Sequence, residues 1–362
     1  DGHGTHVAGI AAGKTYGWAK NAHIYSMKIF NTDKVSDTLG MDLIRFWHEN
    51  KGNNRPTIVN MSYAYSYVID GWVGAAAGDT GQHWDTFTNQ MDVWNFGQAN
   101  FATAQEVNIE TDIEYGSAWA PSYRSAAVDA KLDQLVAAGV HVTIAGNNNY
   151  EVQYNYSDDA NDNYNDFFSR PSYNGGQAIY YHRGSSPRAS TVKGAEMVVT
   201  NIGVEIENNK EVLASSSACG EAMDINAPGT NITSSCSTDT SSAGGRNVSD
   251  YPPDPNFKII SISGTSMAAP QVCGVGALYL QADPTLTPAE LKAKILHDAK
   301  TGLIYDTVWD QKDLDKYEHI EMTDISNVLR TYRGLFGGPN KVLYNRYVGD
   351  VFVRYVAAGG GG

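Results

Sequence analysis

The sequence predicts an α/β fold, a mainly parallel, doubly wound sheet with helices on both faces. Three observations predict it. Segments with a strand pattern alternate with segments with a helix pattern, which is typical of βαβ units. The strand segments are short and mostly apolar, as in strands that are buried on both faces. The two most unusual motifs, around His3 and Ser266, fall at expected strand–helix junctions, where such sheets gather their chemistry.

The first part of the chain supplies two helices and two strands. Residues 5–13 are rich in Ala and Gly and end at Gly13, which predicts a short helix with a glycine stop. Residues 23–30 alternate between apolar and polar side chains, which predicts a strand. Residues 38–49 carry apolar side chains at helical spacing, and residues 56–62 have the composition of a buried strand.

The second part continues the alternation. Residues 126–138 place apolar side chains on one side of a helix that stops at Gly139. A further helix begins near Ser266, and a last one covers residues 288–299, with Thr287 as its N-cap. The strands that we expect in this part are residues 140–145, 197–202, 204–206 and 259–262.

These elements predict one main domain, residues 1–303. Residues 66–124 interrupt the rhythm because they are polar, aromatic and rich in Gly, so we expect a surface insertion there. Residues 304–362 are expected to form a C-terminal extension, which ends in four glycines as a linker does.

Composition and charge exclude several classes of partner. The 362 residues include 40 acids and 26 bases, for a formal net charge of −14. Such a surface repels nucleic acid and anionic membranes, so we expect neither as a partner, and it favours a soluble monomer. No apolar run is long enough for a transmembrane helix.

The three cysteines are too few for a disulfide framework and lack the spacing of a zinc site. Cys219 and Cys236 could pair across a loop, but we favour a structural role for each cysteine. Cys273 lies in an apolar helix and is expected to be a buried, inert thiol.

The segment from Ser261 to Pro270, Ser-Ile-Ser-Gly-Thr-Ser-Met-Ala-Ala-Pro, places Ser266 at the start of a helix of small residues. A serine hydroxyl becomes a nucleophile when a base removes its proton. The unpaired N–H groups of a helix start can stabilise the oxyanion that forms on an attacked carbonyl. We expect Gly264 to allow a sharp bend, and Pro270 to lie in the first turn. The alternative for Ser266 is an ordinary N-cap.

His3 and Asn147 could complete this chemistry. Gly2 and Gly4 leave the imidazole of His3 accessible as a general base, although a lone histidine is more often a surface or capping residue. His6 is expected to be structural. Asn147 follows the strand 140–145, so its amide could donate to the oxyanion. The alternative for Asn147 is a strand-end turn, because Gly-Asn is good turn chemistry.

Five motifs occur in the order found in subtilisin-like serine proteases (subtilases), which the chain resembles over residues 1–300 outside the insertion. They are His3-Gly4-Thr5-His6-Val7-Ala8-Gly9, Asn60-Met61-Ser62, Ala145-Gly146-Asn147, Ala227-Pro228-Gly229 and Gly264-Thr265-Ser266-Met267-Ala268-Ala269-Pro270.

The resemblance implies the subtilase fold, with residues 1–303 as a single catalytic domain. It implies a serine endopeptidase that cleaves polypeptides through an acyl-enzyme, with Ser266 as nucleophile, His3 as base and Asn147 as oxyanion donor. Subtilases are mostly secreted, so we expect an extracellular protein, although the composition also suits an intracellular or virus-encoded one.

One departure concerns the triad aspartate, which precedes the histidine motif in this family. Asp1 is too close to His3 to take that role and is expected to border the substrate cleft. We therefore expect the acid before Asp1, so that residues 1–362 alone are nearly inactive while the longer protein cleaves peptides. The alternative function is an inactive subtilase-like module that binds extended peptides.

The resemblance also implies a substrate cleft along Ser62, Tyr63 and Ala64, with Ala145 and Gly146 opposite. The family's usual Leu-Gly is replaced by Tyr63-Ala64-Tyr65. The tyrosines predict either an aromatic cleft or packing against the insertion.

The family makes structural calcium plausible, although the chemistry requires no cofactor. Asp159, Asn161 and Asn163 match the alternating start of a calcium loop. The turn glycine is absent and Arg170 replaces the closing acid, so we favour a solvated acidic loop over a metal site.

Overall fold

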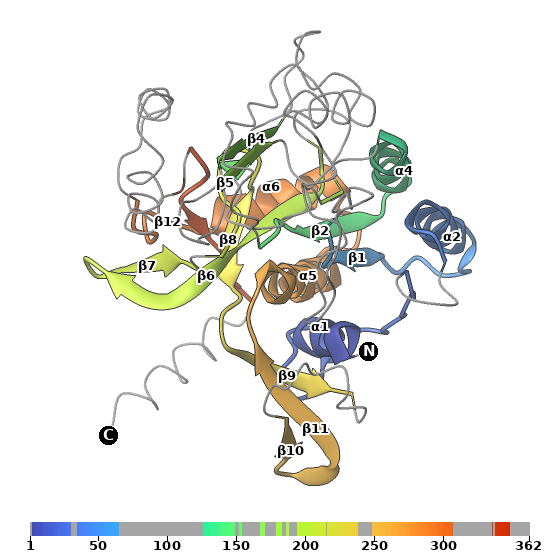
Figure 1. Ribbon diagram of the computed structural model, residues 1–362. Helices are drawn as coiled ribbons and strands as arrows, with labels where there is room; N and C mark the ends of the chain where they lie inside the picture. The colour runs from blue at the N-terminus through green and yellow to red at the C-terminus, as the bar shows by residue number, and fades with distance from the viewer. Residues whose placement is uncertain are drawn as a thin grey trace, which may run out of the picture.

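The computed structural model describes twelve parts of the chain: residues 2–29, 35–64, 126–148, 152–153, 167–170, 179–182, 186–187, 194–214, 216–237, 248–306, 335 and 337–347. Figure 1 shows helices around a central sheet. The helices are α1 (Gly2–Ala12), α2 (Asp37–Asn50), α4 (Ala126–Ala137), α5 (Thr265–Ala282) and α6 (Pro288–Asp298).

The central sheet is mainly parallel, as the sequence predicts. Its order is β1-β2-β6-β8-β13-β12, and β7 pairs with β6. The pairs β1–β2, β2–β6, β6–β8 and β8–β13 are parallel, whereas β12–β13 and β6–β7 are antiparallel. These strands are β1 (Ile58–Met61), β2 (His141–Ala145), β6 (Met197–Glu207), β7 (Lys210–Leu213), β8 (Ile225–Pro228), β12 (Lys300–Thr301) and β13 (Lys341–Val342).

Two smaller sheets flank this one. One is antiparallel, with the order β10-β11-β9, and the other has the order β3-β5-β4. Their strands are β9 (Ile232–Cys236), β10 (Ser249–Tyr251), β11 (Asp254–Ile262), β3 (Val152–Gln153), β4 (Phe167–Arg170) and β5 (Ile179–His182).

Helices cover both faces of the central sheet, because successive residues of β2 point to opposite sides. Val142 and Ile144 pack in one hydrophobic cluster with Met41 of α2 and Leu132 of α4. Ala145 belongs to a second cluster, which contains the buried residues of α5 and α6. All five residues of β2 are buried, including the polar His141 and Thr143, as expected for a strand that is covered on both faces. The doubly wound α/β prediction is confirmed.

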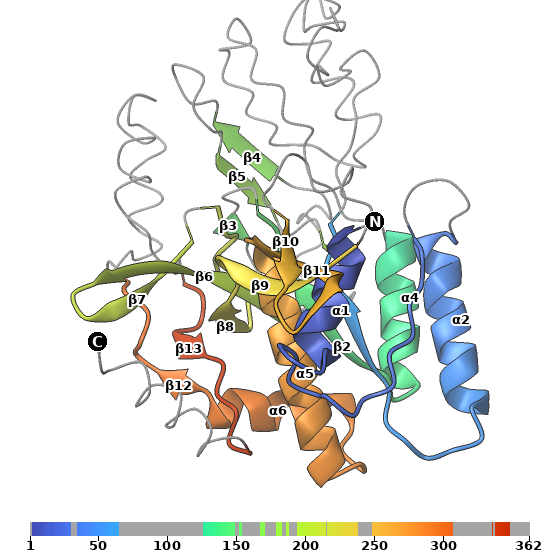
Figure 2. The ribbon, with the colours of Figure 1, turned by 90° about the horizontal axis from the view of Figure 1, so that it is seen from below.

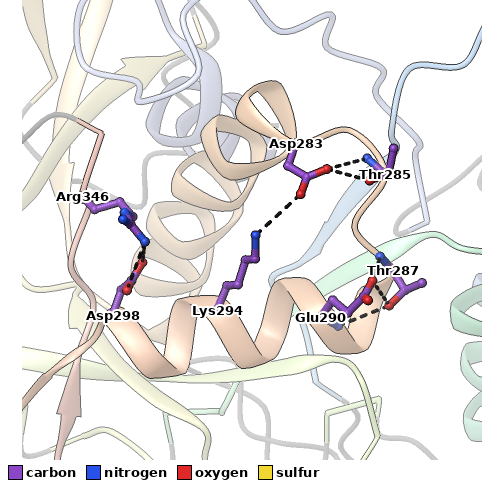
Figure 3. A network of polar contacts seen from close by, with 7 residues as sticks. All are labelled: Asp283, Thr285, Thr287, Glu290, Lys294, Asp298 and Arg346. Atoms are coloured by element: carbon purple, nitrogen blue, oxygen red, sulfur yellow. Dashed lines mark hydrogen bonds and ion pairs between the residues drawn. The ribbon is translucent and has the colours of Figure 1, made fainter.

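Most predicted elements lie where the periodicity placed them, with shifts at their ends. The helix α1 begins at Gly2 rather than residue 5, and the two expected segments 197–202 and 204–206 form the single strand β6. The helix α6 has Thr287 as its N-cap, and Figure 3 shows the reciprocal capping box that it forms with Glu290.

The strand expected at residues 23–30 is wrong for the described residues 23–29, which form no strand. None of the described strands pairs with residues 23–29, so this segment belongs to no ladder of the described sheets. Their apolar side chains are consequently exposed, to 54% for Ile24 and 68% for Tyr25.

The expectation that Pro270 lies in the first turn of its helix is also wrong. The helix α5 begins at Thr265, so Pro270 lies in the second turn, where a proline removes an intrahelical hydrogen bond. The carbonyl that loses this donor is that of Ser266, four residues earlier.

The domain boundary at residue 303 stays a prediction, and the insertion 66–124 lies outside the described residues. Within the predicted extension, β13 pairs with β8 and β12 of the central sheet. No described helix is both long and apolar enough to cross a lipid bilayer.

Candidate active site

The nucleophile candidate Ser266 is the second residue of α5, which follows β11. The turn between them depends on Gly264, whose φ of 153° is rarely open to other residues. The N–H of Gly264 donates to the carbonyl of Gly229 at 2.8 Å, so the helix start is tied to the end of β8. Ser266 is half-buried, and its N–H is among the first four of the helix, which have no intrahelical acceptor.

The base candidate His3 lies in the first turn of α1, and it is exposed. The helix α1 packs closely on α5, because a Cβ at Gly274 would lie 2.5 Å from the carbonyl oxygen of Ala11. Ala11 lies eight residues after His3 in α1, and Gly274 lies eight residues after Ser266 in α5. In Figure 2 both helices start at the same side and run in the same direction. The arrangement brings the turns that carry His3 and Ser266 to one end of the helix pair.

His6 anchors α1 to the sheet of β9 and β11. Its Nε2 lies 3.0 Å from the carbonyl oxygen of Ile232 and 3.1 Å from that of Ile260, and its own carbonyl accepts from the hydroxyl of Ser234. The side chain is fully buried, and this burial lowers the pKa of His6, so the ring stays neutral. These contacts support the structural role expected for His6.

Asn147 lies two residues after the end of β2 and has a φ of 100°. Its N–H donates to the hydroxyl of Thr265 at 3.2 Å, and its side-chain oxygen accepts from the N–H of Asn148 at 2.6 Å. The loop after β2 therefore contacts the residue next to Ser266. This contact brings together two of the three residues assigned to the chemistry, Asn147 and Ser266.

Asn148 is a residue that the sequence analysis missed. Its side-chain oxygen accepts from the N–H of Thr265 at 2.7 Å and from the Thr265 hydroxyl at 3.0 Å. It thus caps α5 from a different element. In the sequence, the asparagine side chain was the only signal for this cap, because the residue that it caps, Thr265, lies more than a hundred positions away.

The residues expected to line the substrate cleft have different surroundings. The hydroxyl of Ser62 donates to the carbonyl of Ser266 at 2.9 Å, so Ser62 lies beside the nucleophile candidate. Tyr63 packs against the hydrophobic cluster of α2 and α4. Ala64 is half-buried and is the last described residue before the gap.

On the opposite side, Ala145 and Gly146 are buried. The carbonyl of Ala145 accepts from the hydroxyl of Ser186 at 2.6 Å, and that of Gly146 accepts from the Gln153 amide at 2.7 Å. A Cβ at Gly146 would lie 2.8 Å from the sulfur of Met223, so only glycine fits there.

Asp224 has a structural role. Its carboxylate accepts from the N–H of Val198 and forms an ion pair with Lys292 at 2.8 Å.

The calcium candidates Asp159, Asn161 and Asn163 lie outside the described residues, as does Asp1. Among the residues that are described, no group of three or more His, Cys, Asp or Glu side chains could hold a metal ion.

The alternative of a Cys219–Cys236 disulfide is wrong, because all three cysteines are free and buried. Burial raises the pKa of Cys273 to about 12, so this thiol stays protonated and inert.

Comparison with known proteins identifies the family. The model of the subtilase family matches residues 1–321. Subtilisin-like protease 8 of Arthroderma otae is 25% identical over 323 residues, which cover 87% of this chain and 46% of that protein. Alkaline serine exoprotease A of Vibrio alginolyticus is 24% identical, over 85% of this chain and 36% of that protein. The chain thus spans less than half the length of these two relatives.

The fold has a solved counterpart in a cold adapted subtilisin-like serine proteinase. The TM-score is 0.50 and the identity 20%, over 95% of this chain and 75% of that chain. The similarity supports the fold assignment, and the family match covers both motifs of the site, around His3 and Ser266. The chain belongs to the subtilase family.

Proposed function

We propose that the protein is a serine endopeptidase that cleaves polypeptides through an acyl-enzyme. The observation that carries this proposal is the packing of α1 on α5, with the turns of His3 and Ser266 at one end of the pair. Membership of the subtilase family supports it.

In the proposed mechanism, the hydroxyl of Ser266 attacks the scissile carbonyl while His3 takes its proton. The N–H of Ser266 and the side-chain amide of Asn147 donate to the oxyanion that forms. His3 then gives the proton to the leaving amine, and water releases the acyl group through the same steps in reverse. The hydrogen bond from the N–H of Asn147 to Thr265 would hold the two oxyanion donors together.

For the substrate we propose an extended peptide that lies along Ser62 and Ala64. The contact of Ser62 with Ser266 supports this position. The packing of Tyr63 against α2 and α4 favours a core role for its ring over a role in the cleft. We further propose that the protein is secreted, as the name of one relative, an extracellular serine proteinase of a Thermus species, suggests. We also propose a monomer, which the net charge of −14 favours. Around Asp159 we still favour a solvated acidic loop, with structural calcium as the alternative.

A fluorophosphonate probe tests the assignment of the nucleophile, since it forms a covalent bond only with an activated serine. We expect the full-length protein to be labelled at Ser266, as located by mass spectrometry of its peptides. The Ser266→Ala variant should lose the label.

Ser263→Ala is a matched control in the same segment, because Ser263 is exposed and accepts from the N–H of Asn231. It should be labelled like the unmodified protein. Absence of label on the unmodified protein, with the fold intact, would favour a peptide-binding module without catalysis.

A further inference from the structure

The carbonyl of Ser266 lacks the donor that an α-helix normally supplies. In a helix each carbonyl accepts from the N–H four residues later, which for Ser266 is position 270. That position is Pro270, which has no N–H. The structure therefore needs a different donor at the residue that carries the candidate nucleophile.

The hydroxyl of Ser62 supplies such a donor. Its Oγ lies 2.9 Å from the carbonyl oxygen of Ser266. In return, the hydroxyl of Ser266 lies 3.4 Å from the carbonyl oxygen of Ser62, at the outer limit of a hydrogen bond. One residue at the end of β1 thus contacts both the main chain and the side chain of Ser266.

Neighbouring groups fix the direction of the Ser62 hydrogen bond. The amide nitrogen of Asn60 donates to the hydroxyl oxygen of Ser62 at 2.8 Å. The amide oxygen of Asn60 accepts in turn from the hydroxyl of Thr143 at 3.2 Å. A serine hydroxyl has one proton, so the Ser62 proton is directed to the carbonyl of Ser266.

This chain of hydrogen bonds is anchored in the sheet. Asn60 of β1 and Thr143 of β2 are direct neighbours in the parallel ladder, and Thr143 is fully buried. Ser62 is held through them by two strands whose positions are set by the core. The first turn of α5 is therefore held by residues outside the helix. They act at the carbonyl of Ser266, which has no intrahelical donor because position 270 is a proline.

We propose that Ser62 is a positioning residue, whose hydroxyl replaces the amide missing at Pro270 and holds Ser266 in its reactive position. This inference rests on the proposed function, in which Ser266 is the nucleophile. A positioning role differs from a role in lining a specificity pocket. A pocket residue would change the KM for a peptide, whereas a positioning residue changes the reactivity of Ser266 itself.

The test is a double-variant cycle of Ser62→Ala and Pro270→Ala in the full-length protein. Pro270→Ala restores an N–H four residues after Ser266, so it should make the Ser62 hydroxyl dispensable. The readouts are the second-order rate constant for labelling of Ser266 by a small fluorophosphonate, kcat and KM for a peptide, and Tm.

With Pro270 in place, we expect Ser62→Ala to lower the labelling rate and kcat by about 10- to 100-fold, since small misplacements of reacting groups have effects of this size. KM should change by less than about threefold. With Pro270→Ala present, the same Ser62→Ala change should lower the labelling rate by less than about threefold.

Three outcomes would overturn the proposal. They are an equal loss in both backgrounds, no loss in either, or a change in KM without a change in labelling. Thr287→Ala is the stability control, because it removes the N-cap of α6, far along the chain from Ser266. It should lower Tm without changing the labelling rate per folded molecule. Failure of the unmodified protein to label at Ser266 would instead contradict the proposed function.

Discussion

At the ends of β1 and β2, Ser62 and Asn147 contact the start of α5 through polar atoms. The N–H of Asn147 donates to the hydroxyl of Thr265, and its side-chain oxygen accepts from the N–H of Asn148. The second contact fixes the orientation of the amide. A fixed donor costs little reorganisation when an oxyanion forms, which is why such donors are effective.

We therefore predict that Asn147→Ala lowers kcat by about 10²- to 10³-fold, the usual effect of removing one oxyanion donor from such a protease. KM should change little, because the donor acts on the transition state rather than on the bound substrate. Steady-state kinetics on a peptide substrate measure both constants. Asn256→Ala is a suitable control, since its exposed amide bonds to Asp254 at the start of β11. Equal kcat values for Asn147→Ala and the control would contradict the role of Asn147.

Sequence motifs were sufficient to propose His3, Asn147 and Ser266 as site residues, because each lies in a short, distinctive segment. They could not predict Asn148 as a cap of α5 or Ser62 as a donor to Ser266. Both contacts join residues more than a hundred positions apart, so they depend on how the sheet is assembled. The same motif around Ser266 contains Pro270, but its effect became clear only once the start of α5 was known.

At the level of elements, the contact between α2 and the start of β2 contains a cluster of basic groups. His141 of β2 is 2% exposed. Burial is the main cause that lowers its pKa to about 4, and the neighbouring His48 is a smaller cause. The pKa of His48 of α2 is also lowered, mainly by burial and less by the neighbouring Lys51. The ammonium of Lys51 lies 3.3 Å from the ring of His48, and both groups contact the hydroxyl of Thr57. The fold therefore opposes the protonation of both histidines.

These depressed pKa values predict that stability falls in acid. The unfolded chain takes up a proton on His141 near pH 6.5, whereas the folded state does so only near pH 4. The stability that depends on neutral His141 is therefore fully present above pH 6.5. As the pH falls towards 4, this residue lowers the free energy of unfolding by up to about 1.4 kcal/mol per pH unit. His141→Leu should flatten the dependence of the free energy of unfolding on pH, as measured by urea denaturation between pH 7.5 and 4.5.

Phe257→Leu is the control for this experiment, because Phe257 is 62% exposed and has no titratable group. It should leave the pH dependence unchanged. Identical slopes for the His141→Leu and unmodified proteins would contradict the account of this contact.

At the level of the whole molecule, periodicity was sufficient to predict the α/β fold. Strands buried on both faces are mostly apolar, and β2 is apolar at Val142, Ile144 and Ala145. Residues 23–29 show the limit of this reasoning, because an alternating pattern describes the side chains of a strand but not whether a neighbouring strand exists. The pairing of β13 with β8 could not be predicted from the sequence either, because it joins two segments far apart in the sequence through very short strands.

The central claim is that His3 and Ser266, which lie 263 positions apart in the sequence, act on each other. The most direct test is the rate of Ser266 phosphonylation by a fluorophosphonate in the His3→Ala variant of the full-length protein. We predict a loss of at least about 10³-fold, since the residues of such a pair work as a unit. His23→Ala, at an exposed histidine, should react like the unmodified protein. Equal labelling rates in the His3→Ala and unmodified proteins would contradict the claim.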